Sequence, residues 1–472
     1  MFTLADLLEA LTATRLDQAS LKISEAHVDS RQVTPNSLFV ALPGENTDGH
    51  AYIGDAFQRG ANLALVQQDV PDEYRVLDIR QGIAPDAAIP QPPFCLRVEN
   101  SLEALQQAAR YWRRKHDLRV IGITGSVGKS TTKELVAEVL SERYVTLKNP
   151  GNYNNEIGLP LTLLKLDGRH QRAVLEMGFY VPGEISFLCD IARPHVGVIT
   201  NVGTVHAERA GSQEVIARGK AELVQALPPA PEGTAILNYD DPWVRPMEDQ
   251  TRAYVFTYGL DPHAHLWASH VEGLGLKGIK LQLHFRNEVL HLRVPLIGRH
   301  SVHTVLRATA VGLVEGVTWS EIVHALQQTH NQLRMVAVRS RSGALIIDDS
   351  YNASPESMLA ALNLLDELTG RKIAVLGEML ELGPYAQASH ELIGRRAAEV
   401  ADVLVTVGEL GKVIATSARQ HGLPAQAVTW VPDTMDTIPM LEDILHEGDT
   451  VLIKGSNGLH MDRIVAALES RS

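Results

Sequence analysis

One short stretch of this chain has residue types and a spacing that could hold a phosphate. In VIGITGSVGKSTTKEL, residues 120–135, a turn ending in Gly-Lys-Ser lies between an apolar strand pattern and a helix pattern. The backbone N–H groups of such a loop bind phosphate oxygens, while its lysine neutralises charge and its hydroxyl binds magnesium. The flanking patterns favour nucleotide binding over an ordinary turn. The predicted contacts are Gly125, Ser126, Val127, Gly128, Lys129, Ser130 and Thr131.

Polar side chains also follow the other apolar strand patterns of this region. AVLEMG ends in Glu176, VGVITNVGTVHAE in His206, and TAILNYDD in Asn238 and Asp241. Singly, a strand-end acid or a loop histidine is as easily explained by exposure to solvent. Ligands of an open α/β sheet, however, bind beyond the carboxyl ends of its strands. Glu176 and His206 could therefore bind magnesium together with Ser130, although oxygen is the more usual magnesium ligand than imidazole.

Alternating strand and helix patterns surround these residues. From residue 118 to about 240, short apolar strands alternate with helical segments, which predicts parallel strands joined by crossover helices. Residues 251–297 contain short alternating stretches and predict an antiparallel edge of the same domain. A later series, ALIIDDS, KIAVLGE, DVLVTVGE and DTVLIKGS, predicts another α/β domain with its loops at the carboxyl ends of the strands.

The length of the chain favours three domains, because 472 residues exceed one ordinary core of roughly 150 residues. Residues 82–97 concentrate four prolines between two patterned regions and predict a boundary. We predict an α/β protein with a small N-terminal α/β domain at 1–97. A central phosphate-loop domain with a parallel sheet and an antiparallel edge follows at 98–329, and a C-terminal Rossmann-like domain at 330–472.

The composition argues against several classes of protein. The formal net charge of −13 argues against a nucleic-acid surface. No apolar run approaches the roughly 20 residues that a membrane span needs. The N-terminus lacks the cationic start and apolar core of a secretory signal. Cys95 and Cys189 have no metal-binding spacing, so we expect buried thiols in a cytoplasmic protein. We also expect the protein to be a monomer.

Several motifs together resemble the Mur ligases: TGSVGKSTTKE, GNYNNEIGLPLTLL, LEMG, ITNVGTVHAE, GKAE, IDDSYNASPESMLAAL and VLGEMLELG. The resemblance begins at residue 29 and runs nearly to the C-terminus, and the short spacing from Gly125 to Lys129 belongs to it. Within the family the chain is similar to the branch that joins D-Ala-D-Ala to a UDP-linked muramoyl tripeptide. The resemblance implies that ATP activates the peptide carboxylate as an acyl phosphate, which the dipeptide amine then attacks.

The resemblance also implies roles for individual residues. Lys129 and magnesium would stabilise the transferring phosphoryl group. Ser130 and Glu176 would bind one magnesium ion, and His206 a second. The residues near adenine and ribose would be Asn238, Asp241 and His300, with Arg334 and Asp349 reaching ATP from the third domain. The uridine-nucleotide region would contain Ser30, Arg31, Thr47, Asp48 and Gly49, and a loop facing peptide and phosphates would contain Asn152, Asn154 and Asn155.

Lys220 in ARGKAEL has two interpretations by residue type alone, as an exposed helical lysine or as a cation held against phosphate. The resemblance identifies it with the family's carbamylated lysine. Carbamylation converts a cationic amine into an anionic oxygen donor suited to magnesium. We therefore expect Lys220 to bind metal as a carbamate.

Departures from the family pattern concern the nucleotide. The family usually has asparagines where this chain has Ser301 and Thr304, and an arginine where it has Asn457. The resemblance therefore does not predict that Ser301 or Thr304 contacts adenine. None of the three lies at a phosphate or metal position, so we expect activity to be retained.

Three alternative functions share the central motif. Folylpolyglutamate synthetase uses the same acyl-phosphate chemistry, but the region DSRQVTPNSLFVALPGENTDGH resembles a uridine-nucleotide domain instead. A sister ligase that adds the third peptide residue would have a DNPR-type motif, where this chain has DDSYNASPESM. A phosphate-loop switch or scaffold would hydrolyse or exchange ATP without any peptide.

Overall fold

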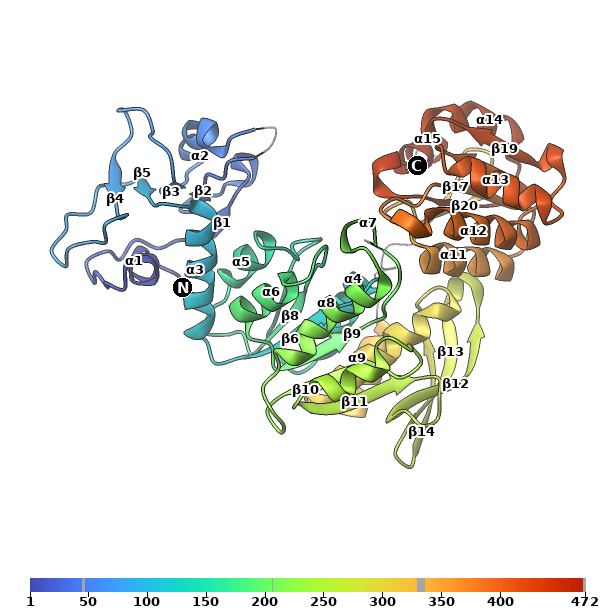
Figure 1. Cartoon of the computed structure of the whole chain (residues 1–472), viewed down its shortest axis with the longest axis horizontal. Coiled ribbons are helices and arrows are strands. Elements are labelled where there is room, and N and C mark those ends of the chain that lie inside the picture. Colours follow the sequence, from blue (N-terminus) through green and yellow to red (C-terminus); the bar gives the residue numbers. More distant parts are fainter. Residues whose placement is uncertain (45–46, 206, 329–335, 470–472) are drawn as a thin grey trace. The chain divides into compact units, whose positions relative to one another are not determined.

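The computed structural model describes residues 1–44, 47–205, 207–328 and 336–469 (Figure 1). Its strands form three sheets, of five, nine and six strands, each accompanied by helices. Most neighbouring strands with a defined register are parallel, which confirms the α/β class that the alternating patterns predict. No helix in these ranges is long and apolar enough to cross a membrane.

The first sheet has the strand order β1-β2-β3-β5-β4, and every neighbouring pair is parallel. Its strands are β1 (Ala26–His27), β2 (Leu38–Val40), β3 (Leu63–Val66), β4 (Val76–Asp78) and β5 (Phe94–Arg97). The helices of this part are α1 (Leu4–Thr12), α2 (Ile53–Gln58) and α3 (Ser101–Arg114). β2 and β3 are fully buried, and Cys95 on β5 is a buried free thiol, as expected.

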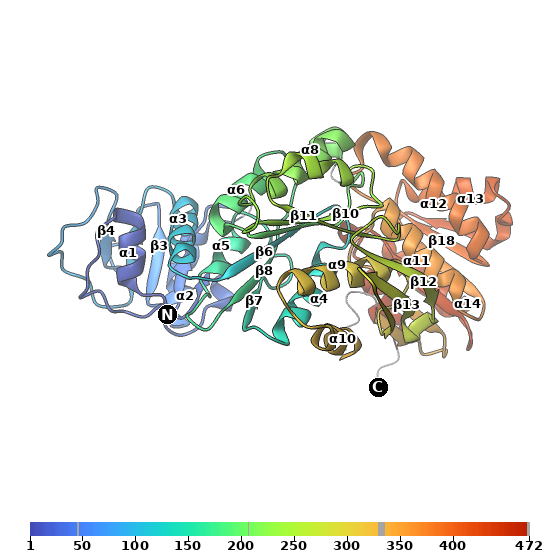
Figure 2. The ribbon, with the colours of Figure 1, turned by 90° about the horizontal axis from the view of Figure 1, so that it is seen from below.

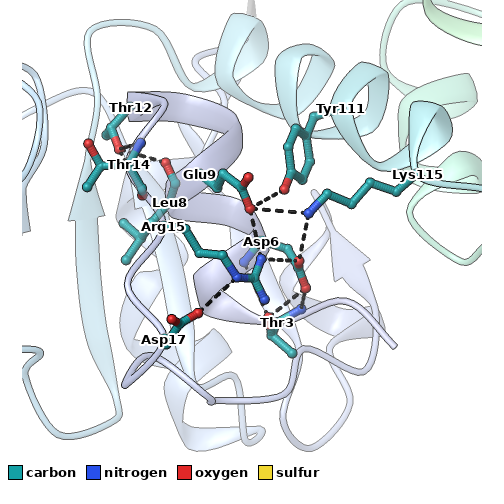
Figure 3. Close-up of polar contacts among 10 residues, drawn as sticks. All are labelled: Thr3, Asp6, Leu8, Glu9, Thr12, Thr14, Arg15, Asp17, Tyr111 and Lys115. Atoms are coloured by element: carbon teal, nitrogen blue, oxygen red, sulfur yellow. Dashed lines mark hydrogen bonds and ion pairs between the residues drawn. The ribbon is translucent and has the colours of Figure 1, made fainter. Parts of the chain in front are cut away.

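A network of charged side chains joins α1 and the segment after it to α3 (Figure 3). Arg15 donates to Asp6 at 2.9 Å and to Glu9 at 2.8 Å. Lys115 donates to Glu9 at 3.2 Å, and Tyr111 also donates to Glu9. These hydrogen bonds, that of Tyr111 first, lower the pKa of Glu9 to about 2. Each cation of this N-terminal network therefore has a carboxylate partner.

The second sheet has the order β14-β13-β12-β11-β10-β9-β6-β8-β7. Its strands are β6 (Arg119–Thr124), β7 (Thr146–Lys148), β8 (Arg172–Glu176), β9 (Val196–Ile199), β10 (Thr234–Asn238), β11 (Tyr254–Gly259), β12 (Leu266–Gly273), β13 (Ile279–Phe285) and β14 (Glu288–Val294). The helices are α4 (Lys129–Ser141), α5 (Gly158–Leu163), α6 (Glu184–Ala192), α7 (Ala207–Ala210), α8 (Gln213–Gln225), α9 (Val302–Val314) and α10 (Trp319–Gln328). Figure 2 shows α8 over one face of β10 and β11, and α4, α9 and α10 over the other.

Burial explains why the second sheet has two kinds of strand. β6, β9 and β10 are buried almost throughout, as continuous apolar strands covered by helices on both faces should be. β12, β13 and β14 alternate between buried and more exposed positions and pair antiparallel. The predicted antiparallel edge is therefore confirmed.

The third sheet has the order β15-β16-β20-β17-β18-β19, with β15 and β16 antiparallel and the other pairs parallel. Its strands are β15 (Val336–Arg339), β16 (Leu345–Asp348), β17 (Lys372–Gly377), β18 (Val403–Val407), β19 (Val428–Val431) and β20 (Thr450–Lys454). Its helices are α11 (Pro355–Glu367), α12 (Ala386–Val400), α13 (Gly411–Gln420), α14 (Thr437–Ile444) and α15 (Asp462–Leu468). One apolar cluster packs α11, α12 and α13 on the sheet, and a second packs α14 and α15.

By its internal contacts the chain divides into two compact units. The first contains 1–122, 144–178 and 184–196, and the second contains 123–143, 179–183 and 197–472. The predicted boundaries after residues 97 and 329 stay a prediction, and residue 329 lies outside the described residues.

Candidate functional site

The phosphate loop connects β6 to α4, and its backbone requires glycine at two positions. Gly125 has φ +148°, and a Cβ there would lie 1.8 Å from Thr200 Oγ1. Gly128 has φ +81° and forms the N-cap of α4, so that the loop ends at a helix N-terminus. Both are left-handed conformations in which a side chain would be strained. The first turn of α4 then contains Lys129, Ser130 and Thr131.

The loop is held in shape by the segment that follows β9. Asn201 accepts from the Ser126 N–H at 3.0 Å through its carbonyl and from the Val127 N–H at 2.9 Å through Oδ1. Thr200 Oγ1 donates to the Val127 carbonyl at 2.7 Å. Thr200 and Asn201 are not among the predicted site residues, although their position directly after a buried strand could have indicated them.

Lys129 is folded back onto its own loop. Its Nζ donates to the carbonyl oxygens of Gly125 at 2.9 Å and Ser126 at 3.3 Å. An ammonium held by carbonyl groups beside a helix N-terminus can neutralise phosphate charge at this loop.

Lys220 lies on α8 and is not an exposed helical lysine, because only 1% of its surface is accessible. Its Nζ lies 4.8 Å from the centre of the Phe179 ring. Burial, together with the nearby charge of Lys129, lowers the pKa of Lys220 well below its usual value. A buried lysine with a lowered pKa has a larger neutral, nucleophilic fraction than an exposed one.

Glu176 ends β8 and is 2% exposed. Asn154 Nδ2 donates to Glu176 Oε1 at 2.8 Å, and Asn149 Oδ1 accepts from the Glu176 N–H at 2.9 Å. Asn155 Oδ1 instead accepts from the N–H of Gly158, the first residue of α5, at 2.9 Å, while Asn152 is exposed. The asparagine loop therefore orients the Glu176 carboxylate, a role that the sequence alone did not predict.

Asn238 and Asp241 follow β10 and bond to the segment after β9. Asn238 Nδ2 donates to the Thr200 carbonyl at 3.0 Å. Asp241 Oδ2 accepts from the Val202 N–H at 3.0 Å, and its Oδ1 accepts from the Trp243 N–H at 2.9 Å. Both side chains thus support the segment that shapes the phosphate loop.

The remaining residues predicted to lie near the nucleotide are in two other places. His300 is exposed, in a short 3-10 helix (Arg299–Ser301) before α9. Ser301 Oγ donates to the Ile297 carbonyl at 2.8 Å and thus has a local structural role. Asp349, after β16, pairs with the buried Lys454 at the end of β20 at 2.6 Å. Asn457 is exposed.

The residues predicted for the uridine nucleotide cluster after β1 and β2. Asp48 accepts from His50 Nδ1 at 2.6 Å and from Gln68 at 2.9 Å. A Cβ at Gly49 would lie 2.8 Å from the Leu42 nitrogen. Ser30 is buried, Thr47 is exposed, and the exposed Arg31 pairs with Asp29 at 2.8 Å.

His206 and Arg334 lie outside the described residues. Among the residues that are described, no group of three or more His, Cys, Asp or Glu side chains could by itself hold a metal ion.

Three family models match most of the chain. The Mur ligase middle domain matches residues 123–312, and the Mur ligase glutamate ligase domain matches 333–457. The model described as the Mur ligase family catalytic domain matches 22–113.

Relatives and solved structures agree with these matches. The chain is 34% identical to UDP-N-acetylmuramoyl-tripeptide–D-alanyl-D-alanine ligase of Synechocystis sp., over 99% of this chain and 97% of that protein. It is similar to the crystal structure of MurF from Acinetobacter baumannii, with a TM-score of 0.83 and 30% identity, covering 98% and 97% of the two chains. It is also similar to MurF from Thermotoga maritima in complex with ADP, with a TM-score of 0.77 and 26% identity, covering 94% and 96%.

Proposed function

Because this chain belongs to the Mur ligase family, we propose that it is the ATP-dependent ligase that joins D-Ala-D-Ala to UDP-N-acetylmuramoyl-tripeptide. The observation that carries the proposal is the glycine-dependent loop at the N-terminus of α4, with Lys129 folded across it. This loop has the geometry of a phosphate site, and the relatives supply the identity of the substrates.

The reaction needs activation, because a carboxylate resists attack by an amine while its only leaving group is an oxide. ATP transfers its γ-phosphoryl group to the tripeptide carboxylate, giving an acyl phosphate and ADP. The amine of D-Ala-D-Ala attacks the acyl carbon, the C–O bond to phosphate breaks, and the ammonium proton is lost. Lys129 and the N–H groups at the N-terminus of α4 hold the phosphoryl oxygens in place during the transfer.

Ser130 and Glu176 would hold magnesium, with His206 at a second ion. Their fit rests on the Ser130 hydroxyl at the start of α4 and on the buried Glu176 carboxylate, oriented by Asn154. Magnesium would neutralise charge on the phosphate oxygens.

Lys220 would bind metal as a carbamate. Its lowered pKa favours the neutral amine, which adds CO2 to form an N-carboxylate and releases one proton. Burial then protects the carbamate from water, and the anion removes the repulsion between Lys220 and Lys129. Labelling with 13CO2, followed by NMR of the folded protein, tests this. A spectrum without a carbamate signal, together with a rate that bicarbonate does not change, would contradict the modification.

The other site residues keep the roles given by the resemblance. Asn238, Asp241, His300, Arg334 and Asp349 serve ATP, while Ser30, Arg31, Thr47, Asp48, Gly49, Asn152, Asn154 and Asn155 serve the UDP-peptide. The domains 1–97, 98–329 and 330–472 bind the UDP precursor, bind ATP and complete the ligation. The enzyme acts in the cytoplasm as a monomer, which analytical ultracentrifugation can check.

One assay distinguishes this proposal from its rivals: phosphate release with ATP and magnesium. We expect release only when UDP-muramoyl-tripeptide and D-Ala-D-Ala are both present, with an equal amount of amide product. Release with folate and glutamate would identify a folylpolyglutamate-type enzyme instead. Release that needs neither pair would identify a phosphate-loop switch and would overturn the ligase proposal.

A further inference from the structure

A buried arginine lies behind the phosphate loop. Arg307 is on α9, which packs against α4, and only 4% of its surface is exposed. Its Nη2 lies 3.1 Å from the position that a Cβ on Gly128 would take. Gly128 is the N-cap of α4, so the guanidinium lies beside the helix end to which the phosphate loop leads.

The polar contacts of Arg307 leave its charge without a counter-charge. Nη2 donates to Thr304 Oγ1 at 2.9 Å, and the buried Nε has no hydrogen-bond partner. The hydroxyl of the buried Tyr258 lies close by and can accept from the guanidinium, while it donates to the carbonyls of Ile199 at 3.0 Å and Thr200 at 3.2 Å, but it carries no charge. Across the described ranges, no carboxylate lies within ion-pair distance of Arg307.

Two acids of the segment after β10 are engaged elsewhere. Asp240, after β10, pairs with His303 Nε2 at 2.9 Å. Asp241 accepts from the backbone N–H groups of Val202 and Trp243. Thr304, for which the resemblance left no adenine contact, has its hydroxyl turned to Arg307 instead.

An uncompensated guanidinium at this place costs stability in the free chain. Its desolvation is unfavourable, and the positive end of the α4 dipole repels it. A polyphosphate bound at the loop would offset both the desolvation cost and the repulsion by the helix dipole. We propose that Arg307 is an affinity-determining residue for the nucleotide, whose buried charge acts on the phosphates through the loop rather than by direct contact. This inference rests on ATP binding at the loop, as proposed above.

Arg307→Met tests the proposal, because methionine fills a similar volume without the charge. We expect the KM for ATP to rise about tenfold, the size of a charge interaction across several ångströms of protein. The affinity should fall more for ATP than for ADP, since ADP carries less charge, while kcat changes less than about threefold. Arg307→Gln should behave like Arg307→Met, and Arg307→Lys should restore most of the affinity.

Arg113 offers a matched control. It is equally buried, at 5% exposure, but its guanidinium donates to the carbonyls of Ala192 and His116 at 2.9 Å and Leu118 at 3.2 Å. Arg113→Met should lower the unfolding temperature of the free chain and leave the nucleotide affinity unchanged. Arg307→Met should show the opposite pattern, with an undiminished unfolding temperature and a smaller increase on adding ATP.

Two outcomes would contradict the inference: equal stabilisation of wild type and Arg307→Met by ATP, or an equal loss of affinity for ATP and ADP. If Arg307→Met or Arg307→Gln fails to fold, Arg307→Lys is compared with the one that folds. If Arg307→Lys then loses as much affinity for ATP as the neutral variant, the charge of Arg307 has no role. A wild-type chain that ATP does not stabilise would instead contradict the proposed function itself.

Discussion

The N-terminal network and the surroundings of the phosphate loop differ in whether their positively charged side chains have carboxylate partners. In the N-terminal network, Arg15 and Lys115 each reach carboxylates of α1 within 3.2 Å and stay partly exposed. Around the loop, Lys220 and Arg307 are almost fully buried, and no ion pair is defined for either of them among the described residues. The first group is complete within the folded chain, whereas the second lacks an anion.

This difference separates charge that stabilises a fold from charge that awaits a ligand or a modification. Exposed ion pairs contribute modestly and do not depend on any other molecule. Buried cations without counter-charge are costly, and proteins keep them where something anionic arrives. We therefore expect substitutions in the two regions to affect different measured quantities.

The largest effect should come from Lys129→Met. Removing the ammonium that neutralises the phosphoryl group should reduce phosphate release at least about 100-fold. Lys115→Met, in the N-terminal network, is the control and should retain activity within about twofold. Similar losses in both variants would contradict the contrast between the two regions.

Lys220→Met should reduce turnover about 100-fold, because a metal ligand is lost with the carbamate. Bicarbonate should no longer raise the rate of the variant. Its thermal unfolding temperature should not fall, because burying methionine requires no desolvation of a charge. Full activity in Lys220→Met would instead mean that Lys220 is a buried lysine without a role in metal binding.

Glu9→Gln should affect stability alone. The variant loses the charge that Arg15, Lys115 and Tyr111 share, which at this partly exposed position should cost about 1 kcal/mol of unfolding free energy. Urea unfolding followed by tryptophan fluorescence measures this change. A changed KM for either substrate would contradict a purely structural role of the network.

The smallest effect should be the pH dependence of the difference in unfolding free energy between wild type and Glu9→Gln. The pKa of Glu9 falls from 4.5 to about 2 on folding, so its contribution is fully present above pH 4.5 and declines as the pH falls towards 2. The stability gap between wild type and Glu9→Gln should therefore be constant from pH 7 to 5 and narrower at pH 3. A gap that stays constant to pH 3 would show that packing, not charge, holds α1 to α3.

The elements of this fold were predictable because their signals are local. The apolar runs of β6, β9 and β10 and the glycines of the loop occur within a few residues of one another, and the structure confirms these strands and their order of succession. The buried position of Lys220 was not predictable from residue type, since ARGKAEL also fits an exposed helix face.

The supports of the loop were harder to find, because they depend on contacts between distant segments. Asn201 is more than 70 residues from the loop that it shapes, and Arg307 reaches Gly128 from a helix near the end of the second sheet's sequence. No spacing rule connects such positions. The asparagine loop shows the same limit. The sequence predicts the same role for Asn154 and Asn155, whereas the fold pairs Asn154 with Glu176 and Asn155 with the backbone N–H of Gly158.

The contact between Gly125 and Thr200 also limits how this enzyme can change by mutation. Every single-base change that replaces glycine introduces at least a Cβ, and at residue 125 that atom would lie 1.8 Å from Thr200 Oγ1. The phosphate loop would then be distorted, and we expect the ligation step to be lost. Substitution of Gly125 is therefore not a route by which the enzyme can vary its phosphate loop.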